Sequence, residues 1–226
     1  MYLMKKNKIT LFVPTLNEIE GMKAVMPHVK KEWVDEILVL DGGSTDGTIE
    51  YARSRGYRVV MQKEKGITNA SREGIKISKG DYIISFSPDG NSLPEAIPQL
   101  VKKINEGYDM VIGSRYLKGA KSEDDDLITA FGNWMFTKMI NICFGGKYTD
   151  SLVMVRAFRK DIVKKLHIDV PRAGLEPILS IRCAKEKLKV TEIPASEPRR
   201  IGGERKMNPL LNGWDILRLI FAELIH

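Results

Sequence analysis

The 226-residue sequence has little cysteine. Its two cysteines, Cys143 and Cys183, lie in apolar or helical stretches and lack the spacing of metal ligands. We therefore expect neither a disulfide framework nor a cysteine-based metal site, and a reducing cytoplasm suits the chain.

Long hydrophobic runs are also absent. The longest apolar stretch, near residues 216–225, is interrupted by Arg218 and Glu223. It falls short of the roughly 20 residues that span a bilayer. The first apolar run, residues 9–13, is too short for the apolar part of a signal peptide. We expect a cytoplasmic protein that does not cross a membrane by itself.

Internal repeats and low-complexity linkers are missing as well, which predicts a single domain over residues 1–226. Hydrophobic residues make up 43% of the chain and charged residues 29%, as in folded globular proteins. The net charge of +7 favours anionic partners, such as nucleotides, lipid phosphates or an anionic membrane. Nucleic acid is not expected, because no helix-turn-helix pattern or interleaving of basic and aromatic residues is present.

The first half of the chain alternates short apolar runs with stretches of helical length. The runs cover residues 9–13, 36–40, 58–61, 82–86 and 110–112, and the expected helices cover 18–31, 46–55, 68–79 and 94–106. This alternation predicts an α/β fold, with a mostly parallel, Rossmann-like sheet covered by helices on both faces.

The second half is less regular. A polar loop over 118–126 should be followed by a helix over 127–144, a strand over 152–158, a helix over 175–187 and a strand over 189–193. A final amphipathic helix carries the apolar residues Trp214, Leu217, Ile220, Phe221 and Leu224.

Polar turns follow three of the predicted strands. They are PTLNE at residues 14–18, DGGSTDGT at 41–48 and SPDGN at 87–91. Each alone is ordinary turn chemistry. Ligands of open α/β sheets bind beyond the carboxyl ends of the strands, so three such turns in order predict one shared cleft. Their carboxylate and amide oxygens suit a hard divalent cation held against a diphosphate.

These motifs, with GSRY at residues 113–116, resemble the GT-A-fold, inverting glycosyltransferase family 2. The chain is most similar to its dolichyl-phosphate mannosyltransferase and polyprenyl-phosphate glycosyltransferase group. The resemblance is strong over residues 9–116 and looser to about residue 210. It implies a nucleotide-sugar-binding half over 8–116 and an acceptor-binding half over 117–226.

The resemblance also implies a reaction. A hexose would move from a nucleotide-sugar of the GDP-mannose or UDP-glucose type to a polyprenyl phosphate, with Mg²⁺ or Mn²⁺ as cofactor. Two alternatives remain open: transfer to a glycan or small polar acceptor without lipid, and a nucleotide-sugar-binding protein without turnover.

Residue roles follow from the same resemblance. The nucleotide-sugar would contact Pro14, Thr15, Asn17, Glu18, Asp41, Gly42, Arg72, Arg200 and Lys206. The metal ion would be held by Asp89 and Asn91. Arg72 also suits an exposed helix. Arg200 and Lys206 belong to a basic loop over 197–208, which resembles a family loop and suits a lid over a diphosphate.

Four residues are the catalytic candidates: Asp89, Arg115, Asp150 and Glu176. Arg115 and Arg156 would hold the acceptor. A polyprenyl phosphate needs no general base, because its oxygen is already an anion. A hydroxyl acceptor requires a carboxylate base, for which Asp150 and Glu176 are the candidates. Glu176 also suits the start of a helix, where the helix dipole favours a negative charge.

The sequence departs from the family pattern at three places. Ser87 replaces the first aspartate of the D-x-D motif, and Gly42 replaces the second aspartate of the D-D-G-S turn. Residues 153–155 replace S-G-F on the acceptor side. Fewer carboxylates should bind the cation more weakly. Loss of metal dependence or of activity is the alternative.

Two helices are rich in apolar side chains. The helix over 127–144 and the last helix, next to the basic loop, could lie on an anionic membrane at its cytoplasmic face. The alternative is that their apolar faces belong to the core.

Overall fold

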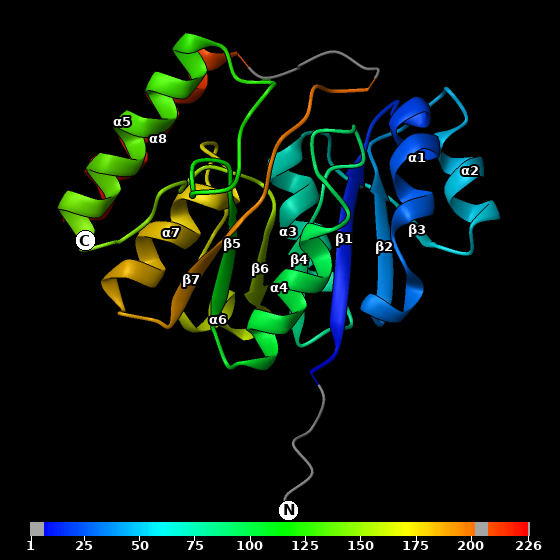
Figure 1. Ribbon diagram of the computed structural model, residues 1–226, viewed down its shortest axis with the longest axis horizontal. Coiled ribbons are helices and arrows are strands. Elements are labelled where there is room, and N and C mark those ends of the chain that lie inside the picture. Colours follow the sequence, from blue (N-terminus) through cyan, green and yellow to red (C-terminus); the bar gives the residue numbers. More distant parts are fainter. Residues whose placement is uncertain (1–6, 202–207, 226) are drawn as a thin grey trace, which may run out of the picture.

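The computed structural model describes residues 7–201 and 208–225, and it contains a seven-stranded sheet in the order β3-β2-β1-β4-β6-β5-β7 (Figure 1). The strands are β1 Ile9–Thr15, β2 Glu36–Asp41, β3 Arg58–Met61, β4 Tyr82–Ser85, β5 Met110–Ser114, β6 Arg156–Arg159 and β7 Val190–Pro194. The helices are α1 Ile19–Val25, α2 Thr48–Ser54, α3 Ile67–Ile77, α4 Ala96–Asn105, α5 Leu127–Phe144, α6 Lys160–Lys165, α7 Leu175–Lys185 and α8 Pro209–Ile225, with short 3₁₀ turns at Met26–His28 and Lys31–Trp33.

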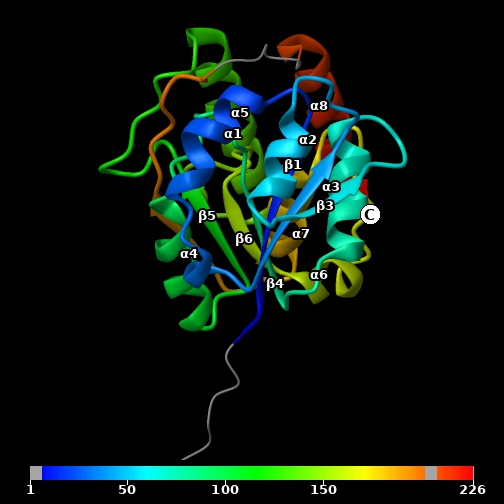
Figure 2. The same ribbon diagram turned by 90° about the vertical axis from the view of Figure 1, so that its right-hand side faces the viewer.

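The predicted mostly parallel α/β sheet is confirmed. Only β6 runs against its neighbours, β4 and β5. The sheet is covered on both faces, with α1 and α4 on one side and α3 and α6 on the other (Figure 2). Every residue of β4 and β5 is therefore buried, which explains why these strands are continuous apolar runs rather than alternating ones. Strand β6 comes from the second half of the chain yet lies between two strands of the first, so both halves build one sheet.

Two predicted elements differ from the expected bounds by more than two residues at one end. The helix predicted over 18–31 ends at Val25. A 3₁₀ turn begins at Met26, and Pro27 within it cannot continue the hydrogen bonding of an α-helix. The strand predicted over 152–158 begins only at Arg156. Residues before it turn instead, so that the carbonyls of Ser151 and Val153 can accept hydrogen bonds from the Arg156 guanidinium. The short helix α6 was not predicted.

Helix α5 has the predicted bounds because both of its ends are capped. The Asp126 carboxylate accepts a hydrogen bond from the Thr129 amide at the first turn, and Gly145 ends the helix in a left-handed conformation. Helices α5 and α8 pack against each other and against α7 (Figure 1). Among the helices of the described ranges, none is both long and apolar enough to cross a membrane.

Candidate active site

The turns after β1 and β2 interlock. The Asn17 amide donates a hydrogen bond to the Ser44 hydroxyl, and the Thr45 amide donates one to the Asn17 side-chain oxygen at 2.9 Å. The Glu18 amide donates to the Thr48 hydroxyl. Asn17 reaches this position with a left-handed backbone, φ 56°, which asparagine tolerates better than most residues. These hydrogen bonds therefore link the first two motifs to each other at the carboxyl end of the sheet.

Asp41 stabilises the turn after β2 through its buried side chain. Its carboxylate is fully buried and accepts four hydrogen bonds, from the Thr15 hydroxyl, the Gly43 amide, and the amide and hydroxyl of Ser44. A carboxylate has about four acceptor positions, so the protein itself uses them all. Asp41 and Thr15 were predicted to contact the nucleotide; in this structure their side chains bind each other, and Asp41 holds the turn after β2 in shape.

Gly42 lies beside that turn, against the side chain of Gln62. A Cβ atom at this position would be 3.3 Å from the Gln62 Oε1 atom and 3.6 Å from the Thr15 carbonyl oxygen. Pro14, near the end of the neighbouring strand β1, is half-buried. Gly42, where the resemblance predicted an aspartate, therefore adds no charge beside this turn.

Asp89 lies on the turn after β4. It is nearly buried, and its Oδ1 atom accepts a hydrogen bond from the Asn91 amide. Helix α1 presses on this turn through Gly21, where a Cβ atom would be only 2.4 Å from the Pro88 carbonyl oxygen. Only a glycine fits at this close approach. The contact therefore fixes the position of Asp89 relative to the turn that follows β1.

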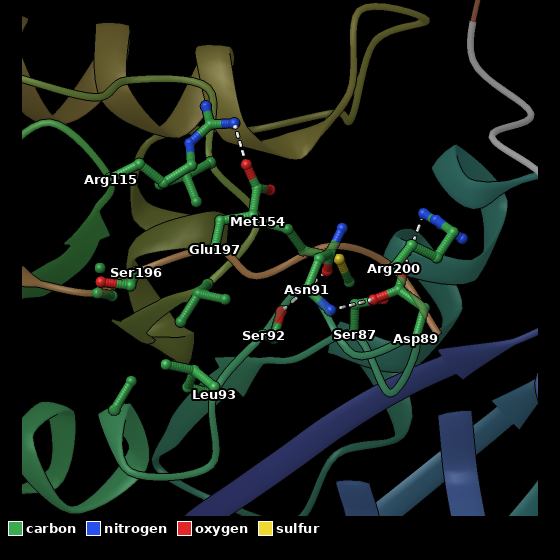
Figure 3. Close-up of a pocket in the computed structure, with 15 residues that line it drawn as sticks. Ser87, Asp89, Asn91, Ser92, Leu93, Arg115, Met154, Ser196, Glu197 and Arg200 are labelled. Atoms are coloured by element: carbon green, nitrogen blue, oxygen red, sulfur yellow. Dashed lines mark hydrogen bonds and ion pairs between the residues drawn. The ribbon is translucent and has the colours of Figure 1, made fainter. Parts of the chain in front are cut away.

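A cavity of about 150 Å³ opens beside Asp89 (Figure 3). Its polar lining comes from the turn after β4, the end of β5 and the segment after β7. The lining residues are Ser87, Asp89, Asn91, Ser92, Leu93, Ala96, Gly113, Arg115, Val153, Met154, Val155, Ala195, Ser196, Glu197 and Arg200. Two predicted metal ligands, one predicted donor-binding arginine and one predicted acceptor-binding arginine thus share a single hollow.

Arg200 brings the predicted donor residues together. Its Nη2 atom lies 2.6 Å from the Asp89 Oδ2 atom, and its Nη1 atom lies 3.8 Å from the Glu18 Oε1 atom. The next residue, Ile201, donates its amide to the Asp89 carbonyl oxygen at 2.6 Å. Glu18, Asp89 and Arg200 therefore form one charged cluster, as expected for turns at a shared strand edge.

Arg115, at the other end of the cavity, is surrounded by carboxylates. It binds Asp150 through Nε at 2.7 Å and Nη2 at 3.1 Å, and its Nη1 atom lies 3.1 Å from Glu197 and 3.4 Å from Asp125. Burial works against the charge of Arg115, but Asp150 above all outweighs it and raises the arginine pKa. Arg115 therefore remains a cation whose charge is already balanced by the protein.

Glu197 is a cavity residue that sequence reasoning did not select. It opens the basic loop, and its Oε2 atom also accepts a hydrogen bond from the Ser122 hydroxyl at 2.6 Å. Burial raises the pKa of its carboxyl group, against the opposing effect of Arg115. Its place three residues after the last strand, at the start of a basic stretch, was the available signal.

Asp150 and Arg156 are not positioned to touch a substrate. Asp150 is fully buried, and its oxygens accept hydrogen bonds from Arg115 and Asn133. Arg156 is also fully buried, and its donors reach the carbonyl oxygens of residues 151, 153 and 176 and the Ser180 hydroxyl. Arg156 was predicted to hold the acceptor, but its guanidinium is enclosed by these partners within the protein. It braces the segment before β6, and Asp150 braces Arg115.

Two other predicted residues, Arg72 and Glu176, lie away from the cavity. Arg72 is exposed and binds Asp169 at 3.1 Å and the Val170 carbonyl oxygen, which ties α3 to the loop before α7. Glu176 is half-buried at the start of α7, where burial raises its pKa, and it does not line the cavity. Lys206 lies outside the described residues.

The cluster can be tested for its fit to a divalent cation. Within residues 7–201 and 208–225, no group of three or more histidine, cysteine or acidic residues is arranged to hold a metal ion. Asp89 supplies one carboxylate, and Ser87 and Asn91 line the same hollow with neutral oxygens. Magnesium commonly uses one or two carboxylates and completes its shell with phosphate oxygens and water. The residues therefore fit a cation that is held jointly with a diphosphate.

Comparison with known proteins places the chain in a family. Residues 10–167 match the model described as "Glycosyl transferase family 2". The chain belongs to glycosyl transferase family 2. It is 29% identical over 221 residues to "Glycosyltransferase AglJ" of Haloferax volcanii, covering 96% of this chain and 70% of the relative. It is 27% identical over 207 residues to "Dolichyl-phosphate hexose transferase" of the same organism, covering 91% of this chain and 89% of the relative.

Solved structures agree with this family fold. Glucosyl-3-phosphoglycerate synthase from Mycobacterium tuberculosis superposes with a TM-score of 0.71 and 20% identity, over 96% of this chain and 80% of the other. A second structure of that synthase, at a TM-score of 0.68 and 19% identity over 96% and 78% of the two chains, is a complex with Mn²⁺, uridine diphosphate and phosphoglyceric acid. The likeness establishes the GT-A glycosyltransferase fold expected from the motifs.

Proposed function

We propose that this family 2 glycosyltransferase is a metal-dependent, inverting hexosyltransferase that uses a nucleotide-sugar donor, of the GDP-mannose or UDP-glucose type, and a polyprenyl phosphate acceptor. The observation that carries the proposal is the cluster of Glu18, Asp89 and Arg200 beside the cavity. It offers a carboxylate for a cation and a guanidinium for a diphosphate. The relatives named for dolichyl and undecaprenyl phosphate support the choice of acceptor.

The difficult step is breaking the bond between the anomeric carbon and the diphosphate, which leaves negative charge on the departing nucleotide. A bound Mg²⁺ or Mn²⁺ would supply electrostatic stabilisation of that charge. Asp89 and Asn91 would hold the cation, and Arg200 would add a bidentate donor for phosphate oxygens. Asp41 acts indirectly, through the turn that it holds in shape.

A polyprenyl phosphate acceptor needs no proton acceptor, because its attacking oxygen is already an anion. The burial of Asp150 agrees with this, since the carboxylate is occupied by Arg115 and Asn133. Arg115 would hold the acceptor phosphate at the far end of the cavity and orient it for attack on the face opposite the leaving group.

One observation favours a second candidate, transfer to a hydroxyl group of a glycan. Glu197 lines the cavity, and burial raises its pKa, which makes it a stronger base than an exposed carboxylate. Assays of hexose transfer to a polyprenyl phosphate and to soluble sugars, run side by side, distinguish the two acceptors.

The donor part of the proposal predicts nucleotide-dependent stabilisation. The panel compares UDP, GDP and their hexose conjugates in a thermal-shift assay. Nucleotides with one of the two bases should raise the Tm of the protein, and Mn²⁺ should increase this rise. A ligand at 100 times its Kd adds about 2.7 kcal/mol to the free energy of unfolding. A flat panel with every nucleotide, with and without metal, would refute a nucleotide-sugar transferase.

The outward faces of α5 and α8 support a membrane location for the acceptor. Both carry exposed apolar side chains, including Leu127 at 90% and Trp214 at 57% exposure. Helix α5 contains no acidic residue. In α8, Asp215 pairs with Arg172 in the loop before α7, and Glu223 pairs with Arg182 of α7. An apolar surface without outward acidic groups suits an anionic leaflet, so we place the protein at the cytoplasmic face of a membrane.

This placement predicts binding to anionic vesicles. The protein should float with vesicles of phosphatidylcholine and phosphatidylglycerol, and the double change Leu211→Ser and Trp214→Ser should weaken binding by about tenfold or more, since each buried apolar side chain contributes about 1.5–3 kcal/mol. Ala222→Ser, also exposed on α8, is the matched control. Equal binding by the double variant would refute a role for α8, and no binding at all would refute the membrane location.

A further inference from the structure

A single stretch of chain crosses the cavity and contacts both of its ends. It comprises Ser196 to Ile201, directly after β7, and we call it the strap. Figure 3 shows its residues Glu197 and Arg200 on the wall of the cavity that also holds Arg115 and Asp89. The strap is therefore the element through which the two ends of the site are linked.

One end of the strap contacts the turn after β4, which carries Asp89, in three ways. The Arg200 guanidinium is 2.6 Å from the Asp89 carboxylate, and the Ile201 amide donates to the Asp89 carbonyl oxygen. The Ile201 side chain covers Gly90, where any Cβ atom would be 2.6 Å from Ile201 Cγ1. A cation bound to Asp89 would occupy the place that the Arg200 charge now takes.

The other end is fastened to the acceptor side. The Glu197 carboxylate is 3.1 Å from Arg115 Nη1 and accepts a hydrogen bond from Ser122. Backbone hydrogen bonds connect Glu197 to Lys121 at 2.9 Å and to Glu123 at 2.7 Å. A negatively charged acceptor group bound to Arg115 would occupy the place of the Glu197 carboxylate.

The charges of the strap thus match those of the proposed substrates in sign and in order. Arg200 meets Asp89 as a metal cation would, and Glu197 meets Arg115 as an anionic acceptor would. With the strap in place the cavity is about 150 Å³, whereas small-molecule sites measure about 300–1,000 Å³. This cavity therefore has little room for a substrate group between Asp89 and Arg115 while the strap is in place.

We propose that the strap is a self-inhibitory element that mimics both substrates and is displaced by them together. This inference rests on the proposed function and specifies how that site is regulated. A nucleoside diphosphate gives Arg200 a new anionic partner and frees Asp89 for the cation. Because the same strap carries Glu197, its release also frees Arg115 for an anionic acceptor. Donor, metal and acceptor therefore bind with positive coupling, and neither end opens alone.

The test measures metal binding at one end after a change at the other. Mn²⁺ alone is titrated against the full chain, with free Mn²⁺ followed by electron paramagnetic resonance. Glu197→Gln does not alter Asp89 or its partners, yet it should tighten Mn²⁺ binding by about fivefold, the lower range of coupling between sites. Arg200→Gln should tighten Mn²⁺ binding as well, and it should strengthen binding of geranyl phosphate, an anionic acceptor probe.

Controls separate the possible failures. Glu123→Gln removes an exposed carboxylate close to the same loop and should leave Mn²⁺ binding unchanged. If Glu197→Gln lowers Tm too far for titration, Ser122→Ala weakens the same anchor by one hydrogen bond and takes its place. If the wild type binds nucleotide but Glu197→Gln and Ser122→Ala leave Mn²⁺ affinity unchanged, the strap is not a self-inhibitory element. A wild type that binds no nucleotide overturns the proposed function instead.

Discussion

Replacing Asp89 with asparagine should reduce kcat by about 1000-fold, the upper range for losing one electrostatic contributor to a transition state. Asp89 is the nearly buried carboxylate on the turn after β4, and the cavity residue Ser87, two positions before it, has a neutral side chain. The asparagine keeps the size of the side chain and removes its charge. The loss should therefore fall on metal-dependent turnover, measured as nucleoside diphosphate released at saturating donor and Mn²⁺.

The matched control is Glu95→Gln, an exposed carboxylate on the same connection between β4 and α4. It should retain wild-type kcat. The Asp89→Asn variant should also lose the Mn²⁺-dependent part of the thermal shift. If both the shift and kcat survive in that variant, Asp89 does not hold the metal and the cluster with Arg200 has another purpose.

Removing Asp150 should lower the free energy of unfolding by about 3–5 kcal/mol, the usual cost of breaking a buried ion pair. Asp150→Ala would leave the Arg115 guanidinium buried without its closest partner, which binds it at 2.7 Å and 3.1 Å. Urea unfolding measures the difference. The exposed pair Lys121–Glu123 is equally short, at 2.6 Å, but Glu123→Gln should leave the free energy of unfolding nearly unchanged because water screens this pair.

The same pair sets a pH dependence. Burial opposes the charge of Asp150, but Arg115 outweighs it and lowers the Asp150 pKa below its ordinary value of 3.8. Protons then bind the unfolded chain more readily than the folded one. The stabilisation is therefore complete above about pH 4 and is lost as the pH falls through the lowered pKa. In Asp150→Ala, the free energy of unfolding should fall less steeply at acid pH than in the wild type. An unchanged fall would show that Asp150 does not cause it.

The strand-end motifs were sufficient to predict which turns would meet. Parallel strands deliver their carboxyl ends to one edge, so Glu18 and Asp89 could be placed near each other without coordinates. Arg200 joins them in the structure at 3.8 Å and 2.6 Å. Asp41 stands at the same edge but points into its own turn. Sequence spacing predicts where a residue lies along a strand. It does not predict which neighbouring donors will form hydrogen bonds with its side chain.

The two arginines of the acceptor half show the same limit. Arg115 and Arg156 both lie near strand ends, and a cation there was expected to meet a phosphate. Arg156 is instead enclosed by backbone carbonyls, while Arg115 reaches the cavity among three carboxylates. Those partners come from segments up to 82 residues distant in the chain. Such pairings depend on tertiary packing, and no local pattern reports them.

The sequence by itself determined the fold family, the alternation of strands and helices, and the edge at which chemistry occurs, because periodicity and turn composition act over a few residues. The tertiary structure alone decided that Glu197 enters the cavity, that Arg115 is balanced by carboxylates, and that α5 and α8 turn apolar faces outward. Burial and charge pairing depend on segments that meet only after folding, and they set the strength of every interaction in the site.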